Sequence, residues 1–128
     1  MREVKYRDVL SVVGTLAMLA RESLPVPAAL QVARLMRAIE GAQRDVQMVQ
    51  AQIIKRYVEH GDDGQPLLTE QGDYQYANEV ARKSAEREWD KLLDQTLMID
   101  ATLDPRTLDE SQLTPETMYR LLPFLSEE

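Results

Sequence analysis

The sequence predicts a mainly α fold: a long antiparallel helical hairpin with a shorter N-terminal helix, a small β element and a short C-terminal helix. Two observations lead to this prediction. An apolar heptad pattern continues without an interior proline from residue 28 to residue 53, and a second helical pattern covers residues 77–95. Helices joined by a loop of about 16 residues pack as an antiparallel hairpin. At this length we expect a single helical domain over residues 1–128.

The first segment, residues 1–23, predicts an N-terminal helix over about 6–21. Gly14 either weakens this helix or lets another helix approach it closely. Two alternate prolines, Pro25 and Pro27, then break the helical pattern, because a proline disfavours helix in the residue before it. Pro27 suits the first position of the next helix. The apolar stripe of the first helix consists of Val9, Val13, Leu16 and Ala20.

The second segment, residues 27–60, predicts the long helix of the hairpin. We expect it to end at His60, with Gly61 in the left-handed cap conformation. Its apolar residues step alternately by four and three and define the seam: Ala28, Val32, Leu35, Ile39, Ala42, Val46, Val49 and Ile53. We expect the seam to pack within the protomer, mainly against the third helix. The alternative is a homo-oligomer joined through the long helix.

Residues 61–76 predict a loop or small hairpin, with turn chemistry around Gly72. Residues 77–95 predict the third helix, whose inner face holds small residues and ends at Trp89. On its outer face acidic and basic residues interleave, which indicates exposed ion pairs. These charged residues are Arg82, Lys83, Glu86, Arg87, Glu88, Asp90, Lys91 and Asp94.

The last segment, residues 96–128, predicts an acidic extended stretch followed by a terminal helix. Apolar and polar residues alternate over 97–103, which is typical of a half-buried strand. Its partner would be the 67–76 hairpin, the N-terminus or a second molecule; in the alternative, a bundle without strands, 97–113 is an ordered coil. Thr114 suits the N-cap of the terminal helix.

These apolar patterns together predict the hydrophobic core. We expect its members to be Val13, Leu16, Leu35, Ile39, Val46, Val49, Ile53, Ala81, Ala85, Trp89, Leu92, Leu121 and Leu122.

The sequence indicates no enzyme, no cofactor and no catalytic or metal-binding residues. The chain has no Cys, and its one His, His60, is explained by a helix end. Acidic residues follow one another at 62–63 without the alternate spacing of a calcium-binding loop. The five glycines never form a phosphate-binding motif. No apolar run reaches the length of a membrane span, and the N-terminus lacks a signal peptide's apolar region.

Charge is distributed unevenly along the chain. Residues 1–59 hold 9 basic and 6 acidic residues, whereas residues 60–128 hold 6 basic and 16 acidic residues. This difference indicates either two differently solvated faces or an acidic surface that meets a basic protein partner. A net charge of −7 and few aromatic residues argue against nucleic-acid binding. The candidate partner-binding residues are Asp100, Asp104, Asp109 and Glu110, with Arg34, Arg37 and Arg44 on the long helix.

Short motifs cover nearly the whole chain in the order Leu24-Pro25-Val26, Tyr57 to Gly64, Gly72-Asp73-Tyr74, Leu97 to Leu103 and Leu113-Thr114-Pro115-Glu116. Together they resemble a group of small, uncharacterised, mainly helical proteins encoded by tailed bacteriophages. The resemblance implies a viral origin and a non-enzymatic role, in the host cytoplasm or in the virion. It carries over no ligand or catalytic residue.

Two functional classes therefore remain open at this level. The first is a structural or assembly component of a phage particle, acting by protein–protein interaction. The second is a host-takeover factor that binds and inhibits or redirects a host protein. A small nucleic-acid-binding protein is a weaker third alternative.

Overall fold

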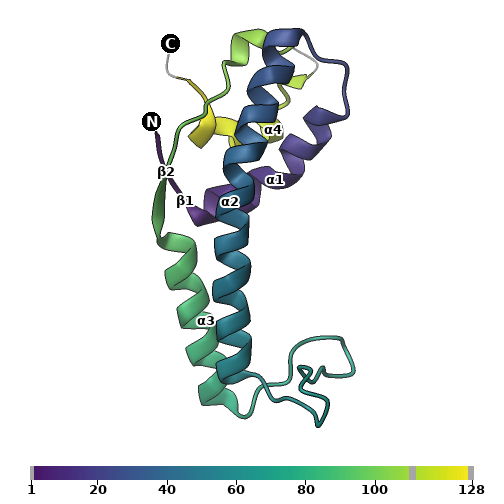
Figure 1. Cartoon of the computed structure of the whole chain (residues 1–128), viewed down its shortest axis with the longest axis vertical. Coiled ribbons are helices and arrows are strands. Elements are labelled where there is room, and N and C mark those ends of the chain that lie inside the picture. The colour runs from purple at the N-terminus through teal and green to yellow at the C-terminus, as the bar shows by residue number, and fades with distance from the viewer. Residues whose placement is uncertain (1, 110–111, 127–128) are drawn as a thin grey trace. The chain divides into compact units, whose positions relative to one another are not determined.

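The structure, a computed structural model, describes residues 2–109 and 112–126 and confirms the predicted mainly α fold (Figure 1). By their internal contacts these residues form two compact units: unit 1 contains the described residues of the ranges 1–44 and 95–128, and unit 2 contains residues 45–94. The elements are β1 (Arg2–Lys5), α1 (Tyr6–Ala20), α2 (Val26–Tyr57), α3 (Glu79–Asp94), β2 (Thr96–Ile99), the 3-10 helix η1 (Pro105–Thr107), α4 (Pro115–Leu121) and the 3-10 helix η3 (Leu122–Phe124).

The helix starts follow from local polar groups. Asp8 accepts a hydrogen bond from the Lys5 backbone N–H at 3.1 Å, which caps the start of α1. Asn78 Oδ1 accepts from the Ala81 N–H at 2.8 Å, so α3 begins after this residue rather than at residue 77. Thr114 Oγ1 accepts from the Thr117 N–H at 3.3 Å, which confirms Thr114 as the N-cap of α4.

The end of α2 differs from the prediction. The helix stops at Tyr57, three residues early, because the chain enters backbone pairing: Val58 bridges to Tyr76, and His60 bridges to Pro66. Gly61 is not a left-handed cap, so that prediction is wrong. Among the described residues, the glycines with positive φ are Gly64 (79°) and Gly72 (87°), which both lie in the following loop.

The predicted strand at 97–103 finds its partner in the N-terminus. Strand β2 pairs antiparallel with β1, with Arg2 opposite Ile99 and Lys5 opposite Thr96. The alternative bundle without strands is therefore wrong. The regular strand is shorter than predicted, because it ends at Ile99 and the chain pairs again only at Leu103, which forms a separate bridge to Leu125.

The core of unit 1 is built around α1 and the first part of α2. The seam residues of this part lie in that core, where they join apolar residues of α1, the two strands and the C-terminal segment. The prediction that the seam packs mainly against the third helix is therefore wrong for its first five members. The fully buried large side chains of this core are Val9, Val12, Leu16, Leu19, Val32, Leu35, Leu103, Leu121 and Phe124.

Unit 2 consists of the end of α2, the loop over residues 58–78 and α3. Here α3 returns antiparallel beside α2, as the predicted hairpin requires (Figure 1). The Arg56 guanidinium on α2 forms an ion pair with Glu88 on α3, with 2.7 Å between the N and O atoms. The buried apolar residues of this unit are Val46, Ile53, Val58, Ala85, Leu92 and Leu93.

Most of the predicted core residues are buried, but not all. Val49 and Leu122 are 39% and 59% exposed, so the prediction is wrong for these two. Val13, Ala81 and Trp89 are only half-buried. The remaining eight are Leu16, Leu35, Ile39, Val46, Ile53, Ala85, Leu92 and Leu121.

Candidate protein-interaction sites

The predicted acidic partner-binding residues differ in how exposed their side chains are. Asp100 and Asp109 are exposed, whereas the side chain of Asp104 is only 22% exposed. Glu110 lies outside the described residues. Asp104 is therefore less accessible to a partner than Asp100 and Asp109.

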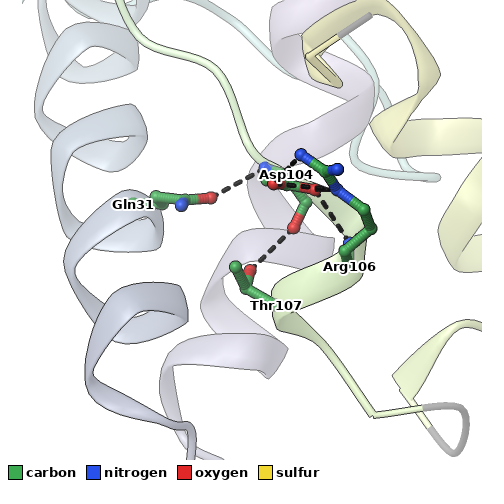
Figure 2. Close-up of polar contacts among 4 residues, drawn as sticks. All are labelled: Gln31, Asp104, Arg106 and Thr107. Atoms are coloured by element: carbon green, nitrogen blue, oxygen red, sulfur yellow. Dashed lines mark hydrogen bonds and ion pairs between the residues drawn. The ribbon is translucent and has the colours of Figure 1, made fainter. Parts of the chain in front are cut away.

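Asp104 organises its own loop (Figure 2). Its backbone N–H donates to Gln31 Oε1 on α2 at 2.7 Å, and its carbonyl accepts from Thr107 Oγ1 at 2.7 Å. Its carboxylate caps η1 by accepting from the Arg106 N–H at 3.0 Å, and it accepts from the Arg106 guanidinium at 2.8 Å. Hydrogen bonding to Arg106 holds the pKa of Asp104 below its usual value. This carboxylate therefore has a structural role in unit 1.

The predicted basic residues Arg34, Arg37 and Arg44 are all exposed on α2. Arg37 and Arg44 are one heptad apart, so they lie on the same side of the helix, with Arg34 beside them. Glu40 is also exposed on this part of α2. The three arginines therefore offer a solvated basic stripe.

A groove of about 600 Å³ lies between α1 and α4 in unit 1. Its polar side chains are engaged with their neighbours. Gln112 Nε2 donates to Glu22 Oε2 at 2.8 Å, and the Arg120 guanidinium donates to the Ser11 carbonyl at 3.2 Å and to Glu116 at 3.3 Å. These bonds tie α1 to the C-terminal segment, so the groove offers few free polar groups to a partner.

A second hollow, of about 210 Å³, lies in unit 2 between α2, α3 and the loop that joins them. Three aromatic side chains line it: Tyr74 and Tyr76 from the loop, and Trp89 from α3. Glu86 lines it as well. We call this hollow the aromatic pocket; its remaining lining residues are Gln50, Ile53, Ile54 and Ala85.

The loop over residues 58–78, which we call the acidic loop, positions the two tyrosines. Three stretches of its backbone pair with one another: the Glu59 N–H donates to the Gln75 carbonyl at 2.9 Å, and the Leu67 N–H donates to the Glu59 carbonyl at 2.8 Å. The Thr69 N–H donates to the Asp73 carbonyl at 2.7 Å, which closes the turn at Gly72. This pairing holds Tyr74 and Tyr76 beside α3.

The acidic loop carries five carboxylates and no Lys or Arg. These are Glu59, Asp62, Asp63, Glu70 and Asp73, and all but the half-buried Glu59 are exposed. The sequence predicts a hairpin within residues 61–76 but not the contribution of residue 59, and it predicts Trp89 as a core residue. The signal for the aromatic pocket was the Tyr-Gln-Tyr stretch at 74–76, because alternate residues of an extended segment point to the same side.

Apart from Asp104, the groups with a shifted pKa are exposed members of ion pairs. Hydrogen bonding to Arg82 lowers the pKa of Glu79, and hydrogen bonding to Tyr57 together with the charge of Glu88 raises the pKa of Arg56. Within residues 2–109 and 112–126, no three His, Asp or Glu side chains gather as a metal site would require. No helix in these ranges is long and apolar enough to cross a membrane.

The chain matches no protein-family model, no curated protein and no solved structure. The sites must therefore be interpreted from their own chemistry.

Proposed function

We propose that this chain is a non-enzymatic protein of a tailed bacteriophage that acts by protein–protein interaction, as a structural or assembly component of the phage particle. Its partner is a protein with a basic surface. The sequence motifs that resemble small tailed-phage proteins support the viral origin, and the chemistry of the acidic loop supports the mode of action.

The observation that carries this proposal is the concentration of charge on an ordered loop. Five carboxylates and no Lys or Arg lie within 21 residues whose backbone is held by internal hydrogen bonds. Self-repulsion among these carboxylates costs stability unless solvent or a basic surface compensates it. A preorganised loop also loses less conformational entropy on binding than a flexible one, which favours association.

Quantitative mass spectrometry of purified particles tests the proposal. If the chain is a component of the phage particle, purified particles should contain the chain at a fixed copy number relative to the major capsid protein. Particles washed at moderate ionic strength should retain it. Complete absence of the chain from finished particles and from assembly intermediates, together with early expression, would contradict the proposal and favour a host-takeover factor.

A further inference from the structure

We propose that the aromatic pocket of unit 2 receives a Lys or Arg side chain of the protein partner. This inference rests on the proposed function, because it assigns a chemical identity to the part of the partner that meets the acidic loop. Its occupant is a cation on a protein, not a free small molecule.

The lining of the pocket is suited to a cation. Tyr74, Tyr76 and Trp89 bring three ring systems to one hollow, and the face of each ring attracts a positive charge. The volume of about 210 Å³ equals the space of roughly seven water molecules. That is enough for an ammonium or guanidinium group with part of its aliphatic stem.

Glu86 adds a charge that selects against neutral occupants. Its carboxylate lies 3.2 Å from the Arg82 guanidinium, which also pairs with Glu79. Two carboxylates therefore share one guanidinium, and the group keeps a net charge of −1. A neutral apolar side chain in the pocket would desolvate this charge without compensating it, whereas a basic side chain would compensate it.

Two cations of unit 2 already have partners. Arg82 is held between two carboxylates, and Arg56 pairs with Glu88 while it lies over the Tyr57 ring, 5.8 Å from the centroid. The acidic loop beside the pocket supplies no Lys or Arg of its own. Its five carboxylates would raise the local concentration of a basic segment and direct it to the pocket.

The chain contains a direct reporter, because Trp89 is its single tryptophan and lines the pocket. The experiment titrates the full chain with a hexa-arginine peptide and follows tryptophan fluorescence. A hexa-citrulline peptide, which has nearly the same shape without the charge, is the matched ligand control. We expect a saturable fluorescence change with hexa-arginine and at least a ten-fold weaker response with hexa-citrulline.

Variants then separate the pocket from the general charge of the loop. We expect Tyr76→Leu to weaken hexa-arginine binding about two- to five-fold, because it removes one ring face, whereas Tyr76→Phe keeps the face and the affinity. We expect Glu86→Gln to weaken binding more than Asp90→Asn, which removes the same charge one turn further along α3 but outside the pocket lining. Circular dichroism confirms that each variant is folded.

Three outcomes would overturn the assignment. These are equal binding of the citrulline and arginine peptides, unchanged affinity in Tyr76→Leu, and a response to tetramethylammonium chloride without a response to hexa-arginine. The first two would leave the pocket as a packing defect, and the third would make it a small-molecule site. None of them changes the copy number in purified particles, so failure of this inference is distinguishable from failure of the proposed function.

Discussion

At the level of single residues, the backbone conformation decides where glycine is required. The acidic loop requires glycine at two positions, whereas α2 contains a glycine that the helix does not require. Gly64 and Gly72 have φ of 79° and 87°, in the region that side chains with a Cβ rarely adopt. Gly41 lies inside α2, and a Cβ added there would meet no atom within 4 Å. The same substitution should therefore have opposite effects at these positions.

We expect Gly72→Ala to destabilise the protein by about 1–2 kcal/mol, because alanine is strained in the left-handed conformation. Gly41→Ala should stabilise it by about 0.5–1 kcal/mol, because alanine has the higher helix propensity. Urea denaturation measures both free energies of unfolding. A stabilising Gly72→Ala would show that the turn in the acidic loop is not formed as described.

The ion pair between Asp104 and Arg106 predicts that the stability of the protein depends on pH. Because Arg106 holds the folded pKa of Asp104 below the unfolded value of about 3.9, the charged carboxylate stabilises the fold above that value. The stabilisation is lost as pH falls through the folded pKa. Asp104→Asn keeps a side-chain acceptor for the cap but removes the charge, so its deficit in melting temperature should be present at pH 7 and shrink below about pH 4.

Melting curves from pH 7 down to the acid limit of folding measure this deficit. The matched control is Asp100→Asn, which removes the same charge from an exposed side chain in the same segment. A deficit of Asp104→Asn that stays constant over the whole pH range would contradict the role of the ion pair. Arg106 is 70% exposed, so the effect should also weaken with added salt.

Among the helices and strands, two substitutions in α2 test where its seam packs. Ile39 is 2% exposed within the core of unit 1, whereas Met48, on the same helix, is 71% exposed in unit 2. Ile39→Asp should destabilise the protein by roughly 3–5 kcal/mol, because it leaves an unpaired charge in the core. Met48→Asp should change the free energy of unfolding by less than about 0.5 kcal/mol.

Chemical denaturation and analytical ultracentrifugation together check this pair. If Ile39→Asp stays folded and only lowers the oligomeric state, the seam at Ile39 joins copies of the chain rather than packing within unit 1. If Met48→Asp dissociates an oligomer, the second half of α2 is the interface between copies.

The elements show which features the sequence could predict and which it could not. Helix α1 and the N-cap Thr114 follow from local signals, namely an apolar stripe and a hydroxyl before a proline. The end of α2 does not follow from local signals, because it is decided by the pairing of Val58 with Tyr76, which lies 18 residues later in the chain. The partner of β2 lies at the opposite end of the chain, and the alternating pattern shows only that a partner is needed.

The candidate site was less predictable than the fold. The acidic character of the C-terminal half is visible in the composition and predicts acidic binding residues at 100–110, where Asp104 also builds its own loop. The aromatic pocket brings together residues from α2, the acidic loop and α3. Neither of the two tyrosines was a candidate, because an extended segment reveals its neighbours only when its backbone pairing is known.

At the scale of the whole molecule, charge should control the rate of association. Exposed carboxylates act on a basic partner mainly through steering, which weakens as salt shortens the Debye length from about 10 Å at 0.1 M. Two acidic groups compete for this role: the exposed residues of the acidic loop, and the segment around Asp100 and Asp109. Asp104 contributes less than its charge suggests, since Arg106 neutralises it.

We therefore expect the association rate with a captured basic partner to fall with added salt, and to fall further in a variant with Asp62→Asn and Glu70→Gln. A matched variant with Asp100→Asn and Asp109→Asn removes the same number of charges and should reduce the rate less. Stopped-flow measurements at several ionic strengths give both rates, and steering requires the difference between the variants to vanish at high salt. A larger loss in the second variant would move the binding surface from the acidic loop to the 100–109 segment. Equal rates in both variants and no salt dependence would leave the carboxylates as determinants of solubility alone, because a surface that steers a partner must respond to the screening of its charge.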